Sequence, residues 1–166
     1  RAGRPLIIGE NNHPDGFDDL VKSTQAQAIW IGRDFNFSEN NQYFSIQPKW
    51  HSQNSDFATL DNLTNQGLLA VNKTIALQAL ISLGCSLDAD CCRLALDNAA
   101  VMGRHQSLCY QSVPVILDVA HNPAAAAVLA DKLMALQGKT VAVAAVLEDK
   151  DWPSMVTQLN PAIDYW

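Results

Sequence analysis

The sequence predicts an α/β protein with a mostly parallel sheet, and three neighbouring features carry this prediction. Residues 115–117 form an unbroken apolar run, and residues 140–147 form a second one. An alanine-rich stretch with helical spacing lies between the two runs. A strand, a helix and a second strand in this order predict a right-handed βαβ unit. Its unbroken apolar runs are typical of strands that are buried on both faces of a parallel sheet.

The start and end of the predicted helix are marked by residues that favour helix termini. Asn122 stands at the position of an N-cap, and Pro123 follows at the first helical position, where its missing N–H is tolerated. Gly138 is suited to end the helix. The spacing of three and four residues predicts an inward face made of Ala126, Leu129, Leu133 and Leu136.

Asp118 and His121 follow the first apolar run directly, at the carboxyl end of the predicted strand. Open parallel sheets bind ligands beyond this end of their strands. We expect Asp118 in a solvent-exposed crevice, where it can accept hydrogen bonds from a sugar or an ammonium group. His121 can donate to a phosphate or carry a proton near neutral pH. The alternative is that Asp118 only orders the turn and that His121 is a solvated loop residue.

A second polar turn follows the second apolar run. It reads Glu-Asp-Lys-Asp at residues 148–151 and contains Lys150. Because the two predicted strands end at the same edge of the sheet, we expect the two polar turns to face one crevice.

The rest of the chain predicts further short elements. Strands are expected at 5–9, 28–31 and 106–111, an edge strand at 42–47, a helix through Leu20 and Val21, and an irregular loop over 50–62. A helix is expected over 68–83 and ends at Gly84. Its predicted apolar face is made of Leu69, Ala76, Ala79, Leu80 and Leu83, and the polar Asn72 falls on the same face. Ser86 is the expected N-cap of a further helix that runs to about Val101.

Composition and charge exclude several classes of protein. The formal net charge of −6 and the isoelectric point near 4.9 argue against a nucleic-acid partner. No apolar run is long enough to span a membrane, so we expect a cytoplasmic protein with no membrane partner. The chain lacks an initiator methionine and ends in what reads as the opening of a third strand at 162–166, which suggests an internal fragment. The spacing of the four cysteines is unlike that of a zinc site and predicts buried free thiols.

The residues now described resemble a known family. The run Leu-Asp-Val-Ala-His-Asn-Pro at 117–123, followed by Asp-Lys-Asp at 149–151, resembles the C-terminal domain of the folylpolyglutamate synthase and dihydrofolate synthase family, of the bifunctional bacterial type. These enzymes are ATP-dependent amide ligases of the Mur ligase superfamily. Met-Gly-Arg at 102–104 is similar to the Pro-Gly-Arg hinge of the family, with Met in place of Pro.

The resemblance implies roles for individual residues. Asn72 matches an Asn that contacts the nucleotide, although the family has Asn-Ala-Ala where this chain continues with Lys73 and Thr74. Arg104 is implied to reach the ATP phosphates once the domains close at Gly103, and Asp118 is implied to bind the nucleoside. His121 is the implied catalytic residue, near the phosphates or the incoming glutamate, and Lys150 is a candidate for ordering the crevice.

The resemblance also implies the organisation and the reaction. Residues 1–103 would end an ATP-binding domain of the Mur ligase type, and 104–166 would open a Rossmann-like C-terminal domain, truncated in this chain. The implied reaction uses ATP and Mg²⁺ to add L-glutamate to dihydropteroate or to folylpolyglutamate through an acyl phosphate, in folate and one-carbon metabolism. The chain has no phosphate loop, so its metal ligands are expected outside this chain and the fragment alone is expected to be inactive. The alternatives are a Mur ligase that acts on a peptidoglycan precursor and a non-catalytic nucleotide-binding module.

Overall fold

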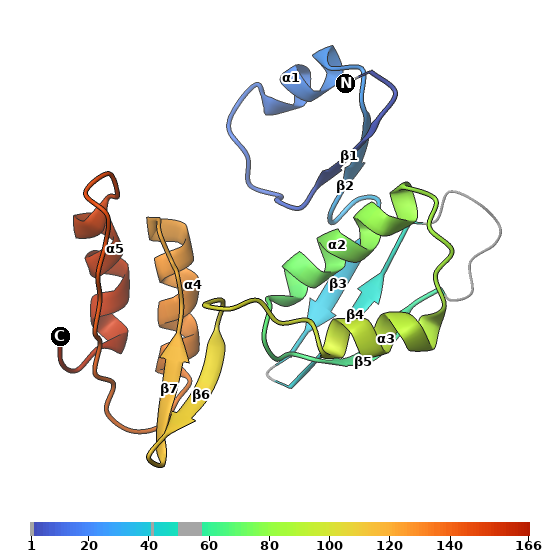
Figure 1. Cartoon of the computed structure of the whole chain (residues 1–166). Coiled ribbons are helices and arrows are strands. Elements are labelled where there is room, and N and C mark those ends of the chain that lie inside the picture. Colours follow the sequence, from blue (N-terminus) through green and yellow to red (C-terminus); the bar gives the residue numbers. More distant parts are fainter. Residues whose placement is uncertain (1, 41, 50–57) are drawn as a thin grey trace. The chain divides into compact units, whose positions relative to one another are not determined.

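The computed structural model describes residues 2–40, 42–49 and 58–166, and these residues form two compact units. The first unit is Arg1–Ala100 and the second is Val101–Trp166 (Figure 1). Both units mix helices with small sheets, so the predicted α/β class is confirmed. The parallel sheet is present only in part, because one strand pair is parallel and the other pairs are antiparallel.

The described residues of the first unit form five strands in two sheets. β1 (Pro5–Ile8) pairs in parallel with β2 (Gln27–Trp30), and α1 (Phe17–Ser23) lies between them in the chain. β3 (Asn36–Glu39), β4 (Tyr43–Gln47) and β5 (Leu60–Thr64) form an antiparallel sheet with β4 in its centre. The predicted strands at 5–9, 28–31 and 42–47 are confirmed. The prediction of an edge position for 42–47 was wrong, because β4 pairs with β3 on one side and β5 on the other. β5 begins at Leu60, near the end of the stretch 50–62 that was expected to be a loop, of which residues 50–57 lie outside the described part.

The main core of the first unit lies between the antiparallel sheet and two helices. α2 (Ala70–Ser82) and α3 (Ala89–Asp97) cover one face of this sheet in Figure 1. The core is made of apolar side chains from all of these elements, namely Phe44, Ile46, Leu60, Leu63, Ala70, Leu77, Ile81, Cys92 and Leu96. A second cluster joins Ile29, Ile31 and Phe35 to Val71 and Ile75 of α2. Helix α2 therefore packs against both sheets.

The buried face of α2 differs from the predicted one. Leu80 and Leu83 are 45% and 70% exposed, and Asn72 is exposed as well. The buried residues are Ala70, Lys73, Thr74, Leu77, Gln78 and Ile81. Polar side chains can lie on this inner face because they find partners: Thr74 Oγ1 donates to the Ala70 carbonyl, and the Gln78 amide bonds with the backbone of Lys49 in both directions.

The predictions for α3 and for the cysteines also need correction. The N-cap is Asp88, not Ser86, because the Asp88 carboxylate accepts a hydrogen bond from Cys91 N at 2.8 Å. The helix ends at Asp97 and not near Val101. All four cysteines are free thiols, but only Cys92 is buried. The prediction of buried thiols was therefore wrong for the other three.

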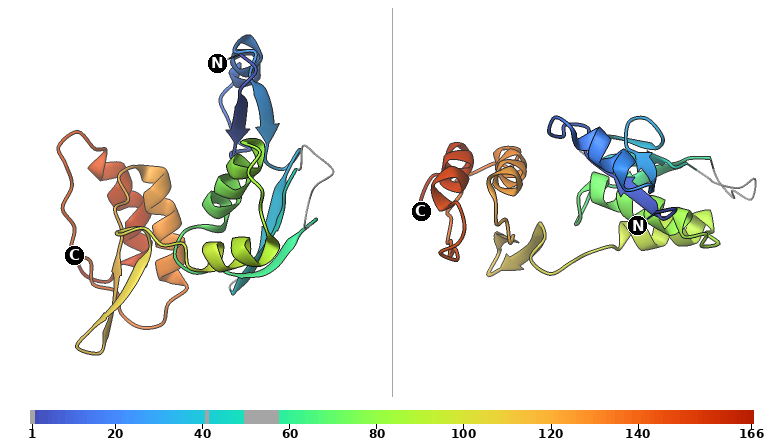
Figure 2. Two further views of the ribbon diagram at one scale, coloured as in Figure 1. Left: turned by 45° about the vertical axis from the view of Figure 1, so that its right-hand side comes forward. Right: turned by 90° about the horizontal axis from the view of Figure 1, so that it is seen from above.

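The second unit consists of a hairpin and two helices that pack on each other. β6 (Gln106–Tyr110) and β7 (Val113–Leu117) are antiparallel, followed by α4 (Pro123–Met134), α5 (Trp152–Leu159) and the short helix η1 (Asn160–Ala162). Figures 1 and 2 show α4 and α5 side by side, with a small core of Ala126, Ala130, Met155 and Leu159 between them.

The start of α4 is as predicted, but its inner face is only partly so. The Asn122 side chain accepts a hydrogen bond from Ala125 N at 2.8 Å, and Pro123 begins the helix. The helix ends at Met134, before Gly138. Ala126 is buried as expected, whereas Leu136 is 55% exposed. The cap was predictable because it depends on neighbours in the sequence, while the inner face depends on where α5 lies.

The predicted βαβ unit is not formed by the described residues. Residues 140–147 make a single parallel bridge, from Val141 to Tyr165, and the Val143 side chain is fully exposed. β7 is not buried on both faces either, since Val113 is 59% and Leu117 44% exposed. A strand requires a hydrogen-bonding partner along its length, and in this structure β7 has β6 as its partner instead.

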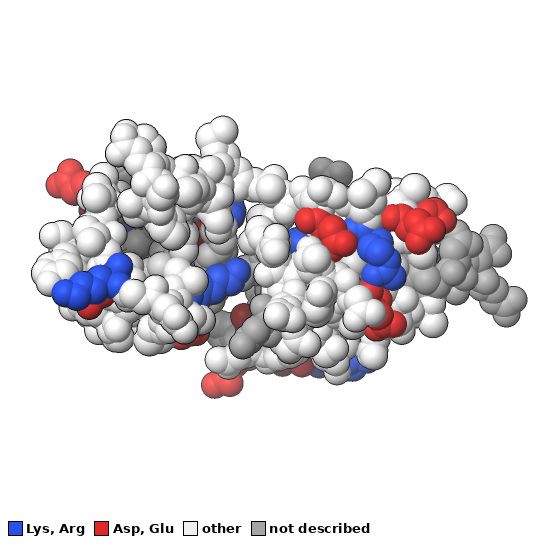
Figure 3. Space-filling view, turned by 90° about the horizontal axis from the view of Figure 1, so that it is seen from below, with Lys and Arg blue, Asp and Glu red and all other residues white. Residues whose placement is uncertain are grey.

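No helix in the described ranges has the length and apolarity needed to cross a membrane. On the face shown in Figure 3, acidic and basic side chains lie beside one another among many uncharged ones. This mixture provides no broad basic surface on that face.

Candidate functional site

Two turns of the second unit meet at Gly103, where a backbone hydrogen bond joins them. Gly103 is buried and has a φ of +69°, and a Cβ at this position would lie 3.0 Å from Val119 Cγ1. Its N–H donates to Gln106 Oε1 at 3.0 Å, and its carbonyl accepts from Val119 N at 2.8 Å. The glycine is therefore needed both for its conformation and for the close approach of the two turns. We call residues 103–106 and 118–121 together the paired turns.

Asp118 ties the paired turns together through its carboxylate. Its Oδ2 accepts from His105 N at 2.8 Å, and its Oδ1 accepts from Ala120 N at 2.7 Å. The Asp118 side chain is only 7% exposed, so the expectation of a solvent-exposed carboxylate was wrong. The bracing role considered as the alternative is present in the structure. It does not use up the carboxylate, because each oxygen can accept a second hydrogen bond.

His105 lies beside this carboxylate and is largely buried. Its Nδ1 is 3.7 Å from Asp118 Oδ2, and its side chain is 13% exposed. Burial lowers the pKa of His105 below its ordinary value of 6.5, the positive charges of Lys132 and Arg104 lower it further, and the negative charge of Asp118 opposes them. His105 is therefore neutral at neutral pH, and the positive charge of the paired turns comes from Arg104.

Arg104 lies on the first of the two turns and His121 on the second. Arg104 is half-buried, its N–H donates to the Val101 carbonyl at 3.1 Å, and its guanidinium forms no ion pair within the part of the chain that the structure describes. His121 is exposed just before α4, and its Nδ1 lies 3.2 Å from the Val119 carbonyl. If Nδ1 carries the proton for this contact, Nε2 is left as the acceptor. The paired turns thus carry a cation, a carboxylate and two imidazoles, of which that of His105 is largely buried and that of His121 is exposed.

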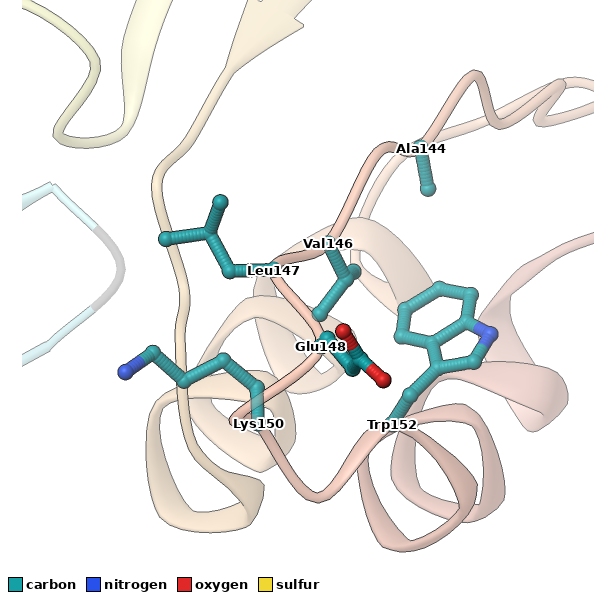
Figure 4. A pocket seen from close by; sticks show the side chains of 6 residues that line it. All are labelled: Ala144, Val146, Leu147, Glu148, Lys150 and Trp152. Atoms are coloured by element: carbon teal, nitrogen blue, oxygen red, sulfur yellow. The ribbon is translucent and has the colours of Figure 1, made fainter.

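Lys150 lines a separate shallow hollow of about 280 Å³. The hollow is lined by Ala144, Val146, Leu147, Glu148, Lys150 and Trp152 (Figure 4). In this view the Lys150 side chain extends away from Trp152, and its ammonium is paired with Asp149, which lowers the pKa of that carboxyl. Asp151 caps α5 by accepting from Ser154 N at 3.2 Å. The prediction that both polar turns face one crevice is not met by this hollow, because Asp118 and His121 are not among its described lining residues.

The structure therefore groups three of the five predicted site residues. Arg104, Asp118 and His121 lie on the paired turns, Lys150 lies on the hollow, and Asn72 is exposed in the first turn of α2 in the other unit. Sequence reasoning missed Gln106 as the partner of Gly103. A polar side chain placed three residues after a predicted hinge glycine was the available signal.

The donor set on the paired turns suits an anion better than a metal ion. A guanidinium forms strong, directional hydrogen bonds with phosphate oxygens. In the described ranges, no three His, Cys, Asp or Glu side chains gather as a metal site would require. The guanidinium of Arg104 is therefore chemically suited to an anionic group such as a phosphate.

Comparison with known proteins extends this result. No protein-family model matches the chain. A dihydrofolate synthase/folylpolyglutamate synthase of Haemophilus influenzae is 31% identical over 185 residues, and the match covers 100% of this chain and 41% of the relative. The enzyme of the same name from Escherichia coli K12 is 30% identical and is covered to 38%. The chain thus spans about two fifths of the length of the curated relatives it matches.

Solved structures of enzymes with the same names are also similar to this chain. E. coli FolC in complex with DHPP and ADP superposes with a TM-score of 0.88 at 30% identity, covering 100% of this chain and 39% of that one. A bifunctional folylpolyglutamate synthase/dihydrofolate synthase with Mn, AMPPNP and L-glutamate bound gives a TM-score of 0.83 at 30% identity, with the same coverage. The enzymes in these solved structures belong to the Mur-type ligases, and this chain is similar to them over its whole length. Within this class, the chain matches a segment of the dihydrofolate synthase/folylpolyglutamate synthases, which confirms the family resemblance seen in the sequence.

Proposed function

We propose that this chain is part of an ATP-dependent ligase that adds L-glutamate to dihydropteroate, to folylpolyglutamate, or to both. The observation that carries the proposal is the similarity over the whole chain to enzymes named for these activities, at 30% identity and a TM-score of 0.88. The bound ADP, AMPPNP and L-glutamate of the solved relatives support ATP and glutamate as substrates here. The Mn of one relative supports a divalent cation, for which we propose Mg²⁺.

The proposed reaction has two steps. The γ-phosphoryl group of ATP passes to a carboxylate of the folate substrate, which gives an acyl phosphate and ADP. The amine of glutamate then attacks the acyl carbon, the amide forms, and phosphate leaves with the loss of a proton from nitrogen. Negative charge on the transferred phosphoryl group must be met by fixed cations in a site that excludes water. Mg²⁺, when bound, would supply part of this charge stabilisation.

The residue roles in this proposal follow from the geometry and from the family resemblance. Arg104 binds the phosphates, and its turn is held in place through Gly103 and Gln106. Asp118 binds the nucleoside with the acceptor capacity that remains beyond its two backbone hydrogen bonds. His121 acts near the phosphates or the incoming glutamate, because its ring is exposed just before α4.

Two further assignments complete the proposal. Asn72 contacts the adenine from the first turn of α2, and Lys150 orders the segment that lines the hollow. Residues 1–103 are assigned to the ATP-binding domain and 104–166 to the C-terminal domain, close to the division between Ala100 and Val101 that the two compact units have. The chain by itself is expected to have no ligase activity.

Arg104 offers the sharpest test of the proposal. In the intact protein, Arg104→Ala should lower kcat/KM for ATP by about 10- to 100-fold, since losing a hydrogen bond to a charged group costs about 1.5–3 kcal/mol. Arg104→Lys should recover only part of this loss, because an ammonium lacks the planar fork that grips two oxygens. The measurement is steady-state formation of ADP at varied ATP, with glutamate and either dihydropteroate or a folate as the acceptor.

The control is Arg33→Ala, which removes an arginine whose side chain is 64% exposed. It should leave kcat/KM within about twofold. The assay also distinguishes this proposal from the two alternative functions, a Mur ligase acting on a peptidoglycan precursor and a non-catalytic nucleotide-binding module. Activity only with a peptidoglycan precursor would identify another Mur ligase, and nucleotide binding without ligation of any acceptor would identify a binding module. An Arg104→Ala variant that matches the parent would remove Arg104 from the phosphate site.

A further inference from the structure

Lys73 is a charged residue in the interior of the first unit. Its side chain is 1% exposed, and it follows Asn72 in the first turn of α2. Its Nζ donates to the Gln66 carbonyl at 2.9 Å and to the Thr64 carbonyl at 3.4 Å, and it lies 5.4 Å from the centre of the Phe44 ring. Burying an ammonium group is unfavourable unless its protons are hydrogen-bonded. Lys73 can therefore lie in the interior only because it makes these contacts.

The segment that Lys73 grips is also held from the other helix. Asp97 of α3 accepts with its Oδ1 from Thr64 N at 2.7 Å and from Thr64 Oγ1 at 2.9 Å. A cationic side chain on α2 and an anionic one on α3 therefore fix the same stretch of backbone. We call residues 64–69 the approach segment, because it leads from the end of β5 into α2. Its anchoring sets the position of the first turn of the helix.

The placement of Lys73 explains a departure from the family pattern. This chain has Asn72, Lys73 and Thr74 where the family resemblance implies Asn-Ala-Ala. Successive residues of a helix are about 100° apart, and here Asn72 is exposed while Lys73 and Thr74 are buried. The large side chain of Lys73 therefore does not cover the face that carries Asn72. It points instead toward the approach segment.

We propose that Lys73 is a positioning residue for the nucleotide site. It does not touch the nucleotide. It holds the approach segment and the first turn of α2 so that the exposed Asn72 side chain is already oriented when adenine binds. This inference rests on the proposed function, in which Asn72 contacts adenine. A contact that is held in place before binding loses less conformational entropy, so fixing it raises affinity without adding a new contact.

The test compares Lys73→Met with the parent in the intact protein. Methionine keeps an unbranched side chain in the interior but removes the ammonium. We expect the KM for ATP to rise about tenfold while kcat stays within about twofold, because losing a contact made equally in the ground state and the transition state raises KM alone. Selection of ATP over GTP, as the ratio of their kcat/KM values, should fall in the same variant. Lys22→Met, at a side chain that is 75% exposed, is the matched control and should change neither value.

A second variant tests the anchoring of the approach segment through α3. Asp97→Asn weakens the hold on Thr64 without altering α2, and it should raise the KM for ATP in the same direction. It decides the question if Lys73→Met fails to fold. If the variants melt earlier but keep the KM and the selection of ATP over GTP, Lys73 serves stability only and the inference is overturned. A parent protein without ATP-dependent ligation would instead overturn the proposed function.

Discussion

The two compact units are held together by different means. The first unit buries apolar side chains between a three-stranded sheet and two helices, and Ile46, Leu60 and Leu63 have no exposed surface. The second unit has a core of four residues between α4 and α5, while the apolar side chains of its hairpin remain 44–67% exposed at Leu108, Tyr110, Val113 and Leu117. Its turns are joined by hydrogen bonds to Asp118 and Gly103. Apolar burial therefore stabilises the first unit, whereas polar contacts hold the candidate site of the second unit in place.

The largest expected effect is a core truncation in the first unit. Leu63→Ala removes a fully buried side chain of β5 and should lower the free energy of unfolding by about 2–5 kcal/mol, since the lost packing and the cavity add together. The matched control is Leu108→Ala in β6, where the side chain is 45% exposed. We expect a loss below about 1 kcal/mol there, measured by urea denaturation. Equal losses at the two leucines would contradict the contrast between the units.

An intermediate effect is expected at Asp118 in the second unit. Asp118→Ala leaves the N–H groups of His105 and Ala120 without their acceptor, which should cost about 1–3 kcal/mol of stability. Hydrogen exchange should locate the loss in the paired turns, with the amides of β4 and β5 unaffected. Asp149→Ala is the control, because that side chain is 66% exposed, and it should stay within about 0.5 kcal/mol of the parent. A stable Asp118→Ala protein would mean that the paired turns do not need this brace.

The smallest effect is a difference in acid sensitivity between the units. The pKa of His105 is lowered from about 6.5, so the unfolded chain binds this proton more readily than the folded one. Its contribution to stability is complete above pH 6.5 and decreases as the pH falls through its lowered pKa. For Asp34 of the first unit, burial raises the pKa but is outweighed by hydrogen bonds from Lys49 and Trp30, so the pKa is lowered from 3.8. Its contribution decreases only as the pH falls below about 3.8.

Hydrogen exchange at a series of pH values, corrected for the intrinsic rate, tests this difference. Between pH 6.5 and 5, protection should decrease in β6 and β7 while β4 and β5 keep theirs. His105→Phe should remove the decrease in protection, because it removes the imidazole whose pKa is lowered in the folded second unit. Loss of protection in both units over the same range would show that acid sensitivity does not distinguish them.

The candidate site was partly readable from the sequence because some of its features depend on close neighbours. Asn122 and Pro123 begin α4 as predicted, since a cap involves residues within one helical turn. Asp118 lies directly after β7 as predicted, because the apolar run that forms the strand ends at Leu117. The contact between Asp118 and His105 was not readable, because His105 is 13 residues away in the chain and meets the carboxylate only when the hairpin forms.

The α/β class, the positions of most helices and strands, and the family resemblance could all be predicted from the amino-acid sequence. The buried face of α2 could not be predicted, because that helix has apolar residues on several sides and its neighbours in the fold select one of them. Gln78 can lie inside because the backbone of Lys49, 29 residues earlier, satisfies its amide. Lys73 can lie inside because the carbonyls of Thr64 and Gln66 accept its protons. Local patterns specify elements, whereas the burial of a polar group depends on partners that only the folded chain brings within hydrogen-bonding distance.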